Sequence, residues 1–190
     1  MDRATTHELI SLAWDALPAR HRQLLDEVGA SQWAVVARGL GDEARDLCIS
    51  AGLEPPIPAQ VAEYNTALGM WLPDLRLALV NEAHQVLREV DSATRDALVT
   101  WVAWHEWGHA LSITSSSPHD PTEGSRLLEL APPGIRERVR LGGYSRQEYI
   151  HELIAETYAM LMRERFEGRC GRPSWLPSEL YRLIERIGTL

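Results

Sequence analysis

The stretch SATRDALVTWVAWHEWGHALSI (92–113) reads as one long helix whose apolar side carries two histidines and a glutamate within one turn. Ser92 suits the N-cap of this helix, and its apolar stripe comprises Leu98, Trp101, Val102 and His105. A buried imidazole or carboxylate costs free energy unless it is paired. Two interpretations follow: neighbouring core groups satisfy these polar side chains, or the side chains bind an ion.

The motif HEWGH (105–109) has the spacing of a metal-binding histidine pair. Residues four apart lie about 40° apart around a helix axis, so His105 and His109 point the same way, one turn apart. Two imidazole nitrogens placed in this way can bind one Zn²⁺. Glu106 lies about 100° from His105, which is too far round for a third ligand but suits a general base that reaches a water on the metal.

The third ligand cannot be read from HEWGH itself. A metzincin pattern would need glycine at Ser112 and histidine or aspartate at Ser115, so that pattern fails. His119 and Asp120, in the segment that follows, stay open as ligands.

The segment HELIAETYA (151–159) is the stronger source of a third ligand. Glu148, Glu152 and Glu156 are spaced by four, so they share one helix face. They would form a solvated acidic edge in the simplest interpretation. However, Glu152 and Glu156 have apolar neighbours nearly all round, and a buried carboxylate pair favours a cation. Two histidines from the first helix and one glutamate from this one would make a catalytic zinc set that leaves a fourth position for water.

The order of elements predicts an α+β fold in a single domain over residues 1–190. We expect N-terminal helices and a first strand in 1–60, a catalytic core in 61–167 and a C-terminal helix in 168–190. The sheet is expected to be small and mostly antiparallel. The periodicity predicts helices over 5–28, broken near Pro18, and a further helix that ends at Gly52. Strands are predicted over 32–38 and on both sides of LPD (72–74). We also expect a connector at EPPIP (54–58), a loop at 114–125 and, after them, a helix that begins with a Ser145–Glu148 capping box.

The formal charge of −8 and the pI of about 5.4 disfavour sequence-independent binding of nucleic acid. The arginines of RERVRLGGYSR (136–146) are the best feature of that alternative, but Glu137 interrupts them. Cys48 and Cys170 form no CxxC pair, so we expect two reduced thiols. The N-terminus has no apolar segment of the kind found in signal peptides, and no run of apolar residues is long enough to span a bilayer. We therefore expect no secretory signal, no membrane association and a cytoplasmic location.

HEWGH followed by ELIAETYA (152–159) resembles the gluzincin metallopeptidases, in which a "glutamate helix" supplies the third zinc ligand. The second motif is similar to the E-x-x-A-[N/D]-x-F-A pattern of small ImmA/IrrE-type metallopeptidases. GMWLPDLRLALVNEA also looks like the hairpin that precedes the active-site helix in minimal gluzincins. The resemblance covers residues 60–167, approximately, and is specific for the two helices.

The resemblance implies a zincin-like fold with an active-site helix and a following glutamate helix. His105, His109 and Glu152 would be the zinc ligands and Glu106 the catalytic base. The substrate would lie extended along an edge strand near 75–81. Glu156 takes the place of a carboxylate that orients a ligand histidine, although the family pattern has Asn or Asp there.

We therefore expect a zinc-dependent peptidase that hydrolyses peptide bonds of a peptide or protein substrate with a metal-activated water. The alternative is a zincin scaffold that grips a partner with little or no proteolytic activity. Tyr144 is a candidate to polarise the substrate carbonyl, with plain packing as its alternative, and His151 is expected to be structural. The sequence makes no prediction of the oligomeric state.

Overall fold

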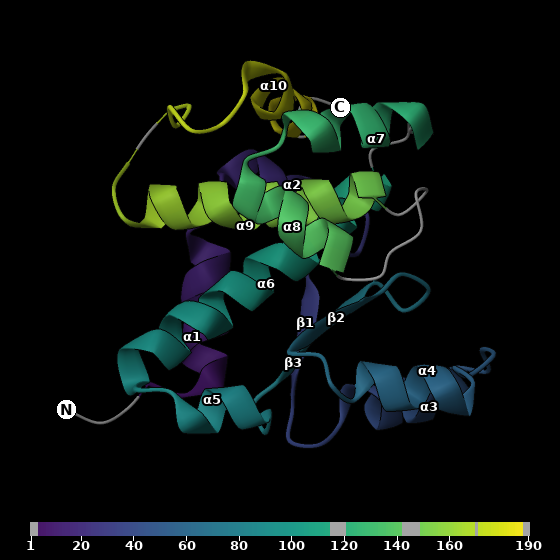
Figure 1. Cartoon of the computed structure of the whole chain (residues 1–190). Coiled ribbons are helices and arrows are strands. Elements are labelled where there is room, and N and C mark those ends of the chain that lie inside the picture. Colours follow the sequence, from purple (N-terminus) through teal and green to yellow (C-terminus); the bar gives the residue numbers. More distant parts are fainter. Residues whose placement is uncertain (1–3, 115–120, 142–148, 170, 188–190) are drawn as a thin grey trace.

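The computed structural model describes residues 4–114, 121–141, 149–169 and 171–187 of the 190-residue chain. Its elements are α1 (Thr6–Asp15), α2 (Ala19–Glu27), β1 (Gln32–Val36), α3 (Leu40–Ser50), α4 (Pro58–Tyr64), β2 (Gly69–Leu72), β3 (Leu77–Asn81), α5 (Gln85–Glu89), α6 (Ser92–Thr114), α7 (Pro121–Leu130), α8 (Pro133–Leu141), α9 (Tyr149–Phe166) and α10 (Ser178–Ile187). In Figure 1 the strands lie between α3 and α4 on one side and α1 and α6 on the other. The α+β class is confirmed.

The sheet is mixed, which corrects the expectation of a mostly antiparallel one. Its strand order is β1-β3-β2, with β1 parallel to β3 and β2 antiparallel to β3. The turn between β2 and β3 makes those two strands a hairpin. No hairpin joins β1 to β3, and the helical connection through α3 and α4 sets their direction as parallel.

The position of β3 also corrects the expected substrate strand. β3 is the central strand, so both of its edges are already paired within the sheet and cannot accept a further strand. The expected strand near 75–81 begins only at Leu77, because Arg76 has φ +50° and belongs to the turn. The edge strand of this hairpin is β2.

Alternating side chains bury the two faces of the sheet against different helices. One face contributes Val36, Met70, Leu72, Leu77 and Leu79 to a small cluster with Leu40 and Leu47 of α3. The other face contributes Trp33, Val35, Trp71 and Val80 to the main core, which also contains Val102 and Ala103 of α6. The sheet therefore positions α6 directly, because β2 and β3 pack against that helix.

The N-terminal helices form as expected, in two pieces that Pro18 separates. Thr5 caps α1 in a capping box: its backbone N–H donates to Glu8 at 2.7 Å, and Glu8 N–H donates to the Thr5 hydroxyl at 3.2 Å. Helix α1 lies against α6, and the indole N–H of Trp104 donates to the Ala13 carbonyl at 2.9 Å. These contacts fix the back of α6.

Other boundaries differ from the expectations. Helices α4 and α7 begin at Pro58 and Pro121, where a connector and a loop were expected, because proline is well tolerated in the first helical turn. The expected helix end at Gly52 is confirmed, and Gly52 and Gly168, which follow α3 and α9, both have positive φ angles. Cys48 is a free thiol. The Ser145–Glu148 capping box and Cys170 lie outside the described residues. Among the described helices, none combines the length and the apolarity needed to cross a membrane.

A buried histidine joins α2 to the back of α9. His21 is 7% exposed, and its Nδ1 lies 2.9 Å from the hydroxyl of Tyr158. Burial, helped by the nearby charges of Arg165 and Arg20, lowers the pKa of His21 from 6.5 to about 4. The folded protein therefore holds this side chain neutral at pH values where an unfolded chain would protonate it.

We predict that the free energy of unfolding falls as the pH drops from 6.5 to about 4, because only the unfolded chain takes up a proton at His21 over that range. The loss from this group is up to about 3 kcal/mol. Chemical denaturation at several pH values should show that His21→Gln removes this part of the pH dependence, while His7→Gln at an exposed position does not. A slope that His21→Gln leaves unchanged would contradict the assignment.

Candidate metal centre

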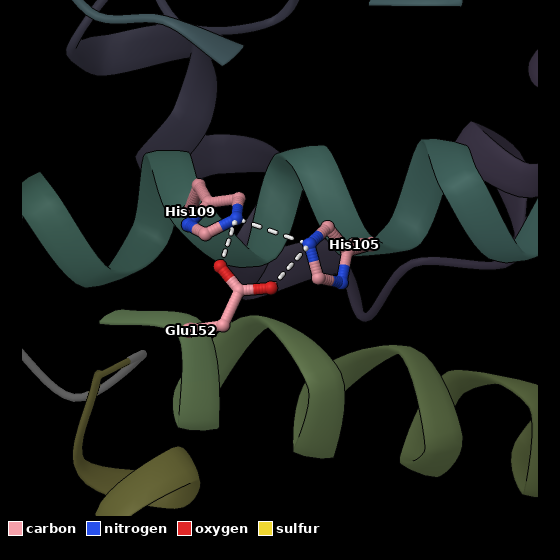
Figure 2. Close-up of side chains that lie close together, drawn as sticks. All are labelled: His105, His109 and Glu152. Atoms are coloured by element: carbon pink, nitrogen blue, oxygen red, sulfur yellow. Dashed lines mark hydrogen bonds and ion pairs between the residues drawn. The ribbon is translucent and has the colours of Figure 1, made fainter. Parts of the chain in front are cut away.

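Helices α6 and α9 bring together the three side chains that the sequence singled out as metal ligands. His105 and His109 lie one turn apart on α6, with their Nε2 atoms 3.1 Å from each other. The two carboxylate oxygens of Glu152 on α9 lie 3.3 Å from His105 Nε2 and 3.2 Å from His109 Nε2. Figure 2 shows the three side chains converging between the two helices.

A close approach of the two helices makes this convergence possible. A Cβ atom added at Gly108 would lie 2.7 Å from the Cα of Ala155, a distance that real contacts essentially never reach. Glycine on α6 and alanine on α9 therefore let the backbones come near enough for one carboxylate to reach both imidazoles.

These donor atoms fit a metal ion. Each residue offers one ligand atom, and the three atoms lie within 4.8 Å of one another. Although burial alone would raise the pKa of Glu152, hydrogen bonds and charge from His105 and His109 hold it below its usual range. The site thus presents a buried carboxylate anion between two imidazole nitrogens, which is an environment that favours a cation.

Glu106 lies beside this cluster rather than in it. Its side chain is buried, and burial raises the pKa of Glu106 to about 8. The charge of Glu152 adds to that rise, whereas His109 and a hydrogen bond with the Trp71 backbone oppose it. A carboxyl group buried next to a metal-ligand cluster, and held by a backbone amide, is positioned to exchange a proton with a molecule in the cleft.

Gly69 is a site residue that the sequence reasoning missed. A Cβ atom there would lie 2.6 Å from the Oε1 atom of Glu106 and 2.3 Å from a methyl carbon of Val102. Only glycine lets the strand approach α6 this closely. Its position inside a predicted strand was the available signal, because such glycines often mark close approach of a backbone to another group.

The edge of β2 faces the same region. The N–H of Asn81 donates to the Leu68 carbonyl at 2.9 Å, and hydrogen-bonded pairs alternate along antiparallel strands. In this register Met70 and Leu72 bond to β3, so Gly69 and Trp71 turn their backbone groups toward the outer edge. The hydrogen bond between the Trp71 backbone and Glu106 agrees with that direction.

A cleft of about 500 Å³ connects the edge strand and the ligand cluster. Its lining comprises Glu63, Tyr64, Thr66, Ala67, Gly69, Met70, Trp71, Pro73, His105, Glu106, His109, Ile113, His151 and Glu152. Ile113 is 48% exposed and adds an apolar wall one turn beyond His109. The cleft therefore combines a polar end at the cluster with apolar walls and the outer edge of β2, which pairs with no strand among the described residues.

His151 lines this cleft, although the sequence suggested a purely structural role. Its Nδ1 atom lies 2.6 Å from the hydroxyl oxygen of Ser112 on α6, so the ring is held between the two helices. From its position in the helix, the side chain of His151 was predicted to point about 100° away from Glu152. The cleft nevertheless reaches both side chains, because its shape depends on how α6 and α9 pack together and not on either helix alone.

Glu156 lies one turn beyond Glu152 and near His105. Its Oε1 atom is 3.9 Å from His105 Nδ1, and its Oε2 atom accepts a 2.7 Å hydrogen bond from Arg138 Nε. The other candidates from the sequence, His119, Asp120, Tyr144 and Glu148, lie outside the described residues.

Comparison with known proteins finds no match for this chain among family models, curated proteins or solved structures. The function of this chain is therefore inferred from the geometry of the site.

We predict that Glu152→Ala loses most of its bound metal, because it removes the carboxylate that joins the two histidines. Zinc content after equal dialysis, measured by atomic emission, is the test. Glu137 on α8 is exposed, and Glu137→Ala serves as the control that should keep the metal of the unaltered protein. Full metal content in Glu152→Ala would remove Glu152 from the ligand set.

Proposed function

We propose that this chain is a zinc-dependent peptidase with a zincin-like architecture. One observation carries the proposal: a buried glutamate outside the ligand set, Glu106, lies beside a His105–His109–Glu152 cluster in a cleft bordered by the outer edge of β2, which no described strand covers. A ligand cluster alone would suit a structural metal. The added general base and the strand edge suit the hydrolysis of an extended chain.

Zinc is the metal proposed because two imidazole nitrogens and one carboxylate oxygen make a ligand set of catalytic zinc enzymes, with one coordination position left open. Bound there, Zn²⁺ would polarise the substrate carbonyl and lower the pKa of water.

Glu106 is proposed to move the proton. Its carboxylate takes a proton from the attacking water and later delivers it to the amine that leaves. The pKa of about 8 that burial gives this group would be lowered by a cation among the neighbouring ligands, which brings it toward neutral pH. The Trp71 backbone and Gly69 hold the carboxylate on the side of the cleft where the strand edge lies.

The substrate is proposed to lie along β2 instead of β3. The outward backbone groups of Gly69 and the outward carbonyl of Trp71 can pair with an extended peptide, while the Trp71 N–H stays with Glu106. The peptide side chains would then meet Met70 and Ile113 in the cleft lining.

Nucleic-acid binding gains no support from the arginines of α8. Arg138 pairs with Glu156, and Arg136 and Arg140 both pair with Glu129. These guanidinium groups already have carboxylate partners within the chain, so they do not form an uncompensated basic surface.

We predict that Glu106→Gln keeps its zinc and folds normally but hydrolyses casein or a peptide library roughly 100-fold more slowly or worse, because general-base assistance contributes about that much. Hydrolysis by the unaltered protein should stop with a chelator and return with Zn²⁺. Glu137→Gln at an exposed position should leave the rate unchanged. Substantial activity in Glu106→Gln would exclude it as the base, and loss of zinc would make it a ligand. A zinc-loaded protein that cleaves nothing would favour the binding-scaffold alternative.

A further inference from the structure

A buried carboxylate that is not one of the three ligands lies next to the candidate metal centre. Glu156 is 7% exposed and lies on α9 one turn after Glu152. Removing a carboxylate from water is costly unless a charged or hydrogen-bonding partner compensates for the lost solvation. A buried Glu156 carboxylate therefore requires a charged or hydrogen-bonding partner close to it.

Arg138 on α8 supplies that partner. Its Nε atom donates to Glu156 Oε2 at 2.7 Å. The guanidinium carbon lies 5.5 Å from the centre of the Trp101 ring, and Nη2 lies 3.7 Å from the sulfur of Met160. Trp101 is one turn before His105 on α6, and Met160 is one turn after Glu156 on α9. Contacts with both helices thus fix the guanidinium, which is itself about half exposed.

With Oε2 held by Arg138, the other carboxylate oxygen turns toward His105. Oε1 of Glu156 lies 3.9 Å from His105 Nδ1, and that buried nitrogen has no hydrogen-bond partner among the described residues. A histidine that binds a metal through Nε2 carries its proton on Nδ1 and needs an acceptor for it. Glu156 offers an acceptor oxygen on the correct side of the ring.

We propose that Arg138 is a positioning residue for the metal centre: it anchors Glu156 so that the carboxylate orients His105 for metal binding. This inference rests on the proposed function, because it assumes that His105 binds a metal. It gives a role to Arg138, which metal binding and hydrolysis alone leave unexplained. It also means that a residue of α8, a helix outside both sequence motifs, affects the affinity of the site for the metal.

The experiment is a double-mutant comparison of zinc affinity, measured by competition with a chromophoric chelator. The variants are Arg138→Gln, Glu156→Gln and the two combined. Arg138→Gln should weaken zinc binding on the order of 10-fold, within the range usual for groups that support a ligand. The combined variant should bind zinc no more weakly than Glu156→Gln alone, because Arg138 acts through Glu156.

Two further variants separate positioning from general stability. Arg138→Lys keeps the charge and should recover part of the lost affinity. Arg140→Gln on the same helix removes a surface pair with Glu129 and should bind zinc like the unaltered protein. The visible spectrum of bound Co²⁺ should change in Arg138→Gln and not in Arg140→Gln, because it reports the geometry of the ligands and not the stability of the fold.

Unchanged zinc affinity in Arg138→Gln would overturn the inference, as would losses in the two single variants that simply multiply in the combined one. If Arg138→Gln does not fold, the comparison of Arg138→Lys with and without Glu156→Gln gives the same decision. Failure of the unaltered protein to bind zinc would instead contradict the proposed function, so the two failures are distinguishable.

Discussion

The close packing of α6 against α9 is the contact on which the candidate site depends. Two of its ligands come from α6 and the third from α9, so the separation of the helices sets whether Glu152 can reach both imidazoles. Gly108 and Ala155 fix that separation, because a Cβ atom at Gly108 would meet the Ala155 backbone at 2.7 Å. A larger residue at Gly108 would push the two helices apart and so separate the ligands, although it would touch none of them directly.

A second close contact, between Gly69 of β2 and Glu106 of α6, places a buried carboxyl group on one side of the ligand cluster. Gly69 brings β2 against Glu106, and the packing that this allows buries the carboxyl group and raises its pKa. The same strand leaves its outer edge beside the cleft. One glycine in a four-residue strand therefore brings the proposed base next to the proposed substrate-binding edge. Helix α1 also packs against α6, through the hydrogen bond from Trp104 to the Ala13 carbonyl.

The sequence predicted the features that depend on local periodicity. The spacing in HEWGH placed His105 and His109 on one helix face. Burial among apolar residues favoured both Glu152 and Glu156, and the resemblance to the glutamate-helix motif selected Glu152. The structure brings His105, His109 and Glu152 together. The sequence did not predict contacts set by tertiary packing. The direction of β1, the central position of β3 and the approach of Gly69 to Glu106 depend on how distant segments pack. The Arg138–Glu156 pair joins residues 18 apart through two helices, and no local pattern indicated it.

The central claim is that His105, His109 and Glu152 bind one zinc ion and leave a position for water. X-ray absorption spectroscopy of the zinc-loaded protein tests this claim most directly. We predict one zinc per chain with two imidazole nitrogens at about 2.0–2.1 Å and oxygen ligands at about 2.0–2.2 Å. A coordination shell that contains sulfur at about 2.3 Å, or fewer than two imidazoles, would contradict the account.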